Sequence, residues 1–296
     1  MRTAKYLLAC FAIVLCTKDA AAQNRPMALN GIATAKNSTD NNTGRNSFRQ
    51  LKVERFLTIS IPEGGANGAS VIYHPKEKLY YAAQAGNKEF PLIIFKSDGS
   101  IVSEEGQATL IDIRGLWYNP RTQEIGGNGY QEFGWFTYSL NRNGIVESIK
   151  IIREGRNQPD DHSPGVLNTK DDEVLFLTGL NIVCYSTNGN KKNKTIQLHI
   201  GARNAEENDA SDSYFEEHYN TRSIIYTGKE GAEIGLLHVT RKQVELYNIK
   251  TGYMTGLVDL PLSFQPETFF NFSYANGVYW IFNKETRKWH GFKEAE

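Results

Sequence analysis

The sequence IIFKSDG at residues 93–99 is a short apolar run followed by a polar turn that ends in glycine. The same pattern returns as FTYSLNRNG at 136–144 and as VCYSTNG at 183–189. Gly99 and its two counterparts are therefore spaced 45 residues apart. An internal repeat of this length predicts a chain built from successive copies of one small structural unit.

Two further copies complete the series. The run VELYNIKTG at 244–252 ends 63 residues after Gly189, and YWIFNKET at 279–286 lies near the end of the chain without a glycine. The longer interval exceeds the period by about 18 residues, which we assign to an insertion in the polar stretch Gly201–Tyr214. Five copies of the unit can thus be counted.

A second polar reversal precedes each apolar run and marks the place where a first strand turns into a second. These reversals lie at 74–77, 119–122, 169–172, 227–230 and 274–277. The 15 Tyr, the 15 Phe and the short alternating runs favour strands, and no amphipathic helix of three turns is evident. A period of about 45 residues with four short strands is typical of a propeller blade. The sequence therefore predicts an all-β, five-bladed β-propeller, with a six-bladed ring as the alternative.

The fifth unit lacks a fourth strand, while an unassigned strand-like run at 53–61 precedes the first unit. We expect this N-terminal strand to pair with the last blade and close the ring, which removes exposed sheet edges. The single propeller domain is expected at 51–296. Residues 23–50 are rich in Asn, Thr, Ser, Gly and Ala, a composition that buries little apolar surface, so we interpret them as a flexible leader.

Residues 1–22 have the pattern of a signal peptide. Two cations in Met1–Lys5 precede the apolar run Tyr6–Cys16, which is too short to span a bilayer. Small residues at 20–22 suit a signal peptidase, so the mature chain is expected to begin at Gln23. This signal predicts a periplasmic or secreted protein, and no later stretch is long and apolar enough to anchor the chain in a membrane. We expect a monomer.

Charge and cysteine content exclude other classes of protein. The chain carries 33 basic and 33 acidic residues, without the clustered basic surface that nucleic-acid binding requires. Cys184 is the one cysteine of the expected mature chain, so no intramolecular disulfide can form. Its apolar surroundings at 181–185 predict a buried structural thiol.

The repeated turns at 93–99, 136–144 and 183–189, within an arrangement that runs from Leu51 to Phe292, resemble exported bacterial propellers that include NHL-repeat and streptogramin-lyase-like proteins. The short signal that ends in Ala-Gln is similar to those of exported proteins of the Bacteroidota. This resemblance implies an architecture. Five-bladed propellers also include glycosidases, glutaminyl cyclases and sugar-binding lectins, so the fold implies no single activity.

Loops that enter the first strand of each blade usually contact the ligand of a propeller, because they converge on the central channel. The candidate binding residues on these loops are Asp112, Arg114, Asp161, Glu217 and Glu267.

Two acids followed by a histidine occur at matching entries, as DDH at 160–162 and as EEH at 216–218. Imidazole and carboxylate groups that face one channel bind divalent metals or share acid and base roles. The candidate catalytic residues are Asp160, His162, Glu216 and His218, and the candidate metal ligands are His162 and His218. The alternative is that both segments are ordinary solvated turns.

Aromatic residues add a further candidate surface. The glycine-rich stretch 126–135 suggests a mobile or closely approached loop that carries exposed rings, Tyr130 and Trp135 among them, as a contact surface. Trp117 and Trp280 lie in predicted strands and are expected in the core.

Three classes of function remain open. One is a binding or scaffold propeller that recognises a carbohydrate or a partner protein, and this class needs no cofactor. The others are a metal-assisted polysaccharide hydrolase or lyase, and a cyclase or lactonase acting on small molecules. A glycosidase needs two inward carboxylates, and the first blade offers no acid where the five-bladed glycosidases place their base. We therefore expect binding, with carbohydrate as the favoured partner.

Overall fold

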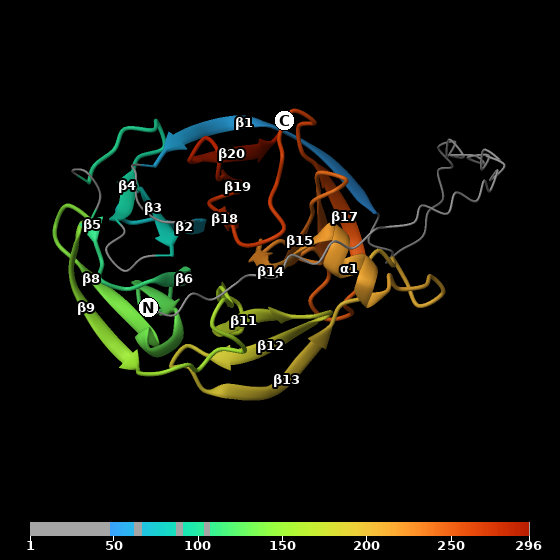
Figure 1. Ribbon diagram of the computed structural model, residues 1–296, viewed down its shortest axis with the longest axis horizontal. Coiled ribbons are helices and arrows are strands. Elements are labelled where there is room, and N and C mark those ends of the chain that lie inside the picture. The colour runs from blue at the N-terminus through green and yellow to red at the C-terminus, as the bar shows by residue number, and fades with distance from the viewer. Residues whose placement is uncertain (1–47, 62–66, 87–90, 104–106, 296) are drawn as a thin grey trace, which may run out of the picture. The chain divides into compact units, whose positions relative to one another are not determined.

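The computed structural model describes residues 48–61, 67–86, 91–103 and 107–295 (Figure 1). These residues belong to one compact unit, Arg45–Glu296. The predicted signal peptide at 1–22 and the predicted leader up to residue 47 lie outside the described residues.

The strands form consecutive groups of four, and neighbours within a group pair antiparallel. The first group is β2 (Asn67–His74), β3 (Leu79–Ala85), β4 (Pro91–Phe95) and β5 (Gln107–Ala108). The second is β6 (Ile113–Asn119), β7 (Glu124–Gly129), β8 (Trp135–Leu140) and β9 (Val146–Arg153). The third is β10 (Val166–Asn168), β11 (Glu173–Thr178), β12 (Asn181–Ser186) and β13 (Lys191–Gln197).

The fourth group is β14 (Tyr219–Tyr226), β15 (Ile234–His238), β16 (Gln243–Tyr247) and β17 (Met254–Asp259). The last is β18 (Phe272–Ala275), β19 (Val278–Asn283), β20 (Lys288–Glu294) and β1 (Arg49–Ser60). Two short helices, η1 (Gln131–Phe133) and α1 (Asp212–His218), complete the regular structure of the described residues. In this part of the chain no helix is long and apolar enough to cross a bilayer.

In the first four groups the repeated polar turns join the third and fourth strands, as the sequence predicts, whereas in the last group the run at 279–286 leads from the second strand, β19, to the third, β20. In the second group, the Asn141 side chain accepts hydrogen bonds from the backbone amides of Asn143 (2.9 Å) and Ile145 (3.1 Å). Gly144 closes this turn at a φ of +74°, a conformation that costs glycine little and other residues more. The Asx-Gly spacing is thus a consequence of turn geometry.

The first strands of the groups contact one another in a circle. β2 contacts β6, β6 contacts β10, β10 contacts β14, β14 contacts β18, and β18 contacts β2. Figure 1 shows β2, β6, β14 and β18 toward the centre of this unit, and β9, β13 and β17 toward its periphery. A side chain at Gly115 would lie 2.4 Å from the Gly165 amide nitrogen, so glycine permits β6 to approach the chain before β10. This arrangement confirms the predicted all-β propeller architecture.

The predicted strand at 53–61 is part of β1, which pairs with strands from two groups. Residues Val53–Ser60 pair antiparallel with β20, and Arg49–Lys52 pair parallel with β17. β1 therefore joins the fourth and last groups into one eight-stranded sheet. Arg49 and Gln50, which were expected in the flexible leader, belong to this strand because they pair with Gly256 and Leu257.

Large aromatic side chains fill the space between adjacent groups. Trp117 packs edge-on against Trp135, with ring centroids 5.3 Å apart, and Trp135 contacts Phe176 of the third group. Trp280 of the last group lies 5.6 Å from the ring of Phe95 in the first group. The predicted core positions of Trp117 and Trp280 are confirmed, because both side chains are buried.

Cys184 lies on β12 as a buried free thiol. Burial raises the pKa of this thiol to about 11. The predicted buried cysteine is confirmed, and a thiol that stays protonated at neutral pH is a weak nucleophile.

Replacement of Ile59 on β1 by Ala tests how firmly this strand is anchored. Ile59 is 3% exposed and packs in one cluster with Val71 and Trp280. We expect the free energy of unfolding, measured by guanidinium denaturation, to fall by about 3 kcal/mol because a cavity replaces the side chain. Ser60→Ala at the next, exposed position is the control and should change it by less than about 0.5 kcal/mol. A loss below about 1 kcal/mol at Ile59 would contradict this packing.

Candidate functional site

Several predicted site residues meet where the first strands of the groups begin. Contacts between neighbouring side chains connect residues from β6, from the loop after β7, from the loop before β10, from β14 and from the loop before β18. We call this set the entry cluster, and its members are Asp112, Arg114, Tyr130, Asp160, His162, Arg222, Phe269 and Phe270.

Arg114 forms the rigid base of the entry cluster. Its two terminal nitrogens donate to the Asp112 carboxylate at 2.5 and 3.1 Å, and both residues are buried. The guanidinium lies 4.4 Å from the Tyr130 ring centroid and 5.6 Å from that of Phe270. A buried charge requires such pairing. The Nε of Arg114 is buried without a hydrogen-bond partner among the described residues.

A second arginine, Arg222, forms a partly exposed ion pair with Asp160. Its guanidinium lies 5.4 Å from the ring centroid of Phe269. The buried side chain of Asn220 holds this region in place, because its Oδ1 accepts from the Arg222 amide (3.1 Å) and its Nδ2 donates to the Phe270 carbonyl (2.6 Å). These contacts fix the start of β14 against the loop before β18.

His162 lies among the aromatic rings of the cluster. Its ring centroid is 5.1 Å from that of Tyr130 and 5.7 Å from that of Phe269. Burial lowers the pKa of this imidazole, and the positive charge of Arg114 lowers it further. Its Nδ1 is buried and has no hydrogen-bond partner in the described part of the chain. His162 is therefore a neutral donor or acceptor at pH 7.

A groove adjoins the entry cluster and shares Arg222 with it. This entry groove has a volume of about 770 Å³, and its lining residues are Thr178, Gly179, Leu180, Asn181, Gln197, Asp212, Phe215, Glu216, Thr221 and Arg222. α1 forms one wall, anchored by buried Phe215, and Ser211 caps it by accepting from the Tyr214 amide at 3.2 Å. The predicted insertion, Gly201–Tyr214, thus contributes Asp212 and the start of α1 to one side of the groove.

The two acid-histidine segments differ in structure. Residues 216–218 were expected in a loop, but they end α1, because the Ser211 cap starts a helical turn there. Glu216 lines the entry groove, whereas the His218 Nδ1 lies 2.9 Å from the Thr240 hydroxyl and Glu217 is exposed. The described residues contain no group of three or more His, Cys, Asp or Glu arranged to hold a metal ion.

Other candidates have separate roles. Asp161 forms a surface ion pair with Arg156 at 3.5 Å. Glu267 takes part through its backbone carbonyl, which accepts from the Asn220 side chain at 3.3 Å. The binding roles predicted for their side chains stay predictions.

The expectation of an exposed ring at Trp135 is wrong. Trp135 is 0% exposed, and residues 124–129 form the buried strand β7 where a glycine-rich loop was expected. A Cβ at Gly126 would lie 2.5 Å from the indole nitrogen of Trp117. The glycines are therefore present because β7 passes close to large aromatic rings. Tyr130, by contrast, is half-exposed in the entry cluster.

Sequence reasoning missed Arg222, Phe269 and Phe270. Arg222 lies within β14, beyond the entry loop, and the two phenylalanines resemble ordinary core residues in sequence. One signal was available. Phe269 and Phe270 directly follow Glu267 and Thr268 in a predicted entry loop, and this position indicates that the two rings can reach the channel.

Comparisons with known proteins support the fold. No protein-family model and no curated protein matches the sequence. The glutaminyl cyclase of Myxococcus xanthus is similar in structure, with a TM-score of 0.53, 9% sequence identity, and coverage of 84% of this chain and 100% of that chain.

Two other structures are less similar. A protein of unknown function from Bacteroides thetaiotaomicron VPI-5482 has a TM-score of 0.45 at 9% identity, over 82% of this chain and 76% of that one. The β-propeller domain of Myceliophteria thermophila Cps50 (Swd1) has a TM-score of 0.44 at 9% identity, over 81% of this chain and 100% of that one. At 9% identity, the likeness to the cyclase shows a shared β-propeller fold and no activity.

The titration of His162 tests the electrostatics of the entry cluster. We expect its NMR titration midpoint below the ordinary value of about 6.5. Arg222→Gln should raise the midpoint by removing a cation, and Asp160→Asn should lower it by removing an anion. Because the fold disfavours the protonated ring, the associated stability is present above pH 6.5 and is lost as the pH falls.

Lys250→Gln removes an exposed cation outside the cluster and is the matched control for Arg222→Gln. It should leave the His162 midpoint unchanged. If Arg222→Gln and Lys250→Gln have the same effect, Arg222 does not act on His162.

Proposed function

We propose that this chain is an exported, five-bladed binding propeller that recognises an uncharged carbohydrate at the entry cluster and entry groove. One observation carries the proposal: half-exposed aromatic rings lie beside paired arginine and aspartate side chains and next to a polar groove. The five-bladed count rests on the groups of four strands and on the circle of contacts between their first strands.

Carbohydrates present two kinds of surface, and the entry cluster offers a partner for each. Their ring faces carry C–H groups that pack on flat aromatic rings, and Tyr130 and Phe269 supply such rings. Their hydroxyls both donate and accept hydrogen bonds. The Arg222–Asp160 pair offers donors and acceptors in one place, and Asn181, Gln197 and Thr221 add more along the groove.

The charges of the cluster and the groove disfavour an acidic ligand, because the groove adds the carboxylates of Asp212 and Glu216. Arg114 is paired with Asp112, Arg222 with Asp160, and Arg156 with Asp161. His162 adds no charge at neutral pH, because burial and Arg114 lower its pKa. An acidic polysaccharide would need an unpaired cation, so a neutral glycan is the better match.

Binding is better supported than hydrolysis. A glycosidase uses two carboxyl groups on either side of the scissile bond, one as acid and one as base or nucleophile. In the entry cluster, both carboxylates are engaged by arginine side chains, Asp112 through both of its oxygens. A hydrogen-bonded ion pair holds its donors and acceptors in fixed positions, which suits the recognition of hydroxyl groups.

Calorimetry with residues 23–296 and a panel of neutral and acidic oligosaccharides tests this proposal. We expect binding to a neutral glycan, and a loss of affinity of at least about tenfold on Phe269→Ala, because the stacking face is removed. Tyr253→Ala removes a half-buried ring that lies against His199, outside the cluster, and should leave the affinity unchanged.

A chelator provides the second control. Affinity that persists in EDTA agrees with a metal-independent binding module. Affinity that requires a divalent metal, or that is the same in Phe269→Ala and the parent chain, would contradict the proposal.

A further inference from the structure

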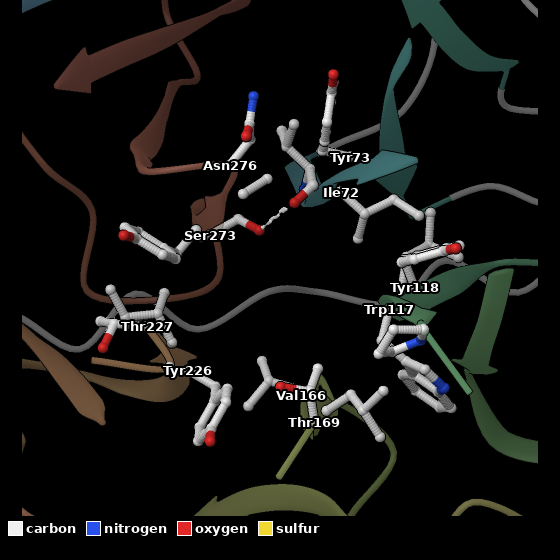
Figure 2. A pocket seen from close by; sticks show the side chains of 18 of the residues that line it. Ile72, Tyr73, Trp117, Tyr118, Val166, Thr169, Tyr226, Thr227, Ser273 and Asn276 are labelled. Carbon is white, nitrogen blue, oxygen red and sulfur yellow. Dashed lines mark hydrogen bonds between the residues drawn. The ribbon is translucent and has the colours of Figure 1, made fainter. Parts of the chain in front are cut away.

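A pocket lies at the opposite end of the same strands, where the first strand of each group turns into the second. We call it the turn pocket (Figure 2), and its volume is about 360 Å³. β2, β6, β10, β14 and β18 all contribute lining residues. The pocket therefore lies on the axis around which the groups are arranged.

The residues that line the turn pocket carry no charge. Aliphatic side chains from the strands, among them Val71, Leu116 and Ile225, form much of its wall. Its polar contributors are hydroxyl and amide groups, such as Thr169, Thr227 and Asn276 in the turns. A charged ligand would lose its hydration here without an opposite charge to replace it.

Half-buried tyrosines recur around the pocket. Four of the groups place a tyrosine at or near the end of their first strand, at Tyr73, Tyr118, Tyr226 and Tyr274. The repeat in the sequence thus creates a partial ring of aromatic side chains. Burial raises the pKa of Tyr226, and raises that of Tyr274 to about 12, so these hydroxyls keep their protons.

The hydroxyl of Ser273 in the pocket wall already has its partners. It donates to the Val71 carbonyl at 2.8 Å and accepts from the Val71 amide at 3.0 Å. Figure 2 labels Ser273 and marks hydrogen bonding of its hydroxyl with a dashed line. The hydroxyl groups of a sugar would therefore find few free hydrogen-bond partners along this wall. An apolar ring has no polar group to leave unpaired there.

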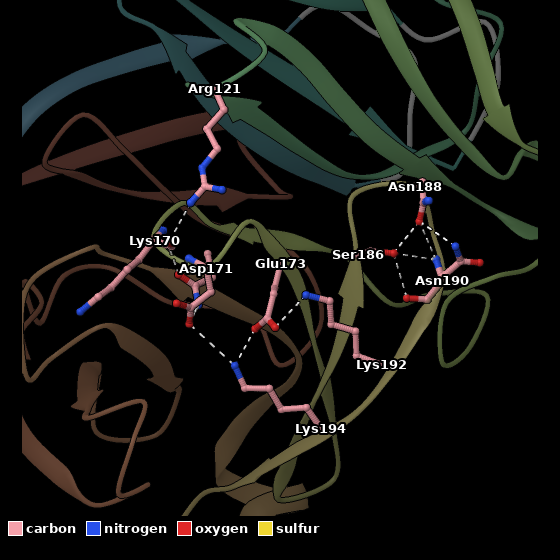
Figure 3. A network of polar contacts seen from close by, with 10 residues as sticks. Arg121, Lys170, Asp171, Glu173, Ser186, Asn188, Asn190, Lys192 and Lys194 are labelled. Atoms are coloured by element: carbon pink, nitrogen blue, oxygen red, sulfur yellow. Dashed lines mark hydrogen bonds and ion pairs between the residues drawn. The ribbon is translucent and has the colours of Figure 1, made fainter.

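Hydrogen bonds and ion pairs hold several charged residues near the rim (Figure 3). Arg121 donates to the Lys170 carbonyl at 2.9 Å, which links the turn after β6 to the turn after β10. Lys194 lies 2.6 Å from Glu173 and 3.7 Å from Asp171. These contacts fix the turn that carries Thr169, so this part of the rim is preorganised.

We propose that the turn pocket is a second binding site, for an uncharged small molecule with an apolar aromatic body of about two rings and a hydroxyl or carbonyl at one edge. The size follows from the volume, because a cavity of about 150 Å³ takes up benzene. The edge group meets the polar turns at the rim, and the ring body contacts the aliphatic wall. This site is independent of the entry cluster.

Three probes with one ring system and different charges test the proposal: 2-naphthol, 2-naphthoate and 2-naphthylmethylammonium. We expect 2-naphthol to bind residues 23–296 in a fluorescence titration at pH 7, and each charged probe to bind at least about tenfold more weakly. Thr169→Trp places a large ring at the exposed rim and should abolish binding of 2-naphthol. Thr195→Trp, at an exposed position of β13 outside the pocket, should not.

Phe269→Ala separates this site from the proposed glycan site. It should leave the 2-naphthol affinity unchanged, whatever its effect on glycans. Equal affinity for the three probes, or equal binding by Thr169→Trp and Thr195→Trp, would overturn the proposal.

Discussion

β1 pairs with β20 along Val53–Ser60 and with β17 along Arg49–Lys52, and the remaining sheets depend on this double pairing. A propeller avoids aggregation by leaving only short, protected edges, which requires that its first and last groups meet. Here the N-terminal strand of the chain is the outer strand of the last group, and the next strand along the chain, β2, begins the first group. The contact between β18 and β2 then completes the circle of first strands. Both ends of these strands are thereby held in place, the entry cluster at one and the turn pocket at the other.

Most of the fold could be predicted because its determinants are local and repeated. The Asx-Gly turns impose a positive φ at positions such as Gly144, and such a turn can be recognised in a single sequence. The spacing between repeated turns revealed a period of about 45 residues. Because the last unit lacks a fourth strand, residues 53–61 could be predicted to close the ring. The pairing of Arg49 with β17 was not predictable, because it depends on how two groups meet in space.

The candidate site was predictable in part. The start of β6 carries Arg114 and the loop before β10 carries His162 into one cluster, because the first strands of the groups begin at the same end of the channel. Arg222 reaches the cluster from within a strand, and Trp135 is buried because β7 runs beside large rings. Both outcomes depend on packing between groups that are distant in sequence. The same limit applies to the turn pocket, whose tyrosines are visible in the sequence but whose cavity is not.

Native-state hydrogen exchange tests the central claim, that β1 is an integral part of the closed ring. The account predicts that the amides of Leu57 and Ile59 are protected as strongly as those of β19, because release of β1 would open the sheets on both sides of it. Fast exchange along β1 with full protection of β19 would show a strand that frays on its own, and would contradict the account.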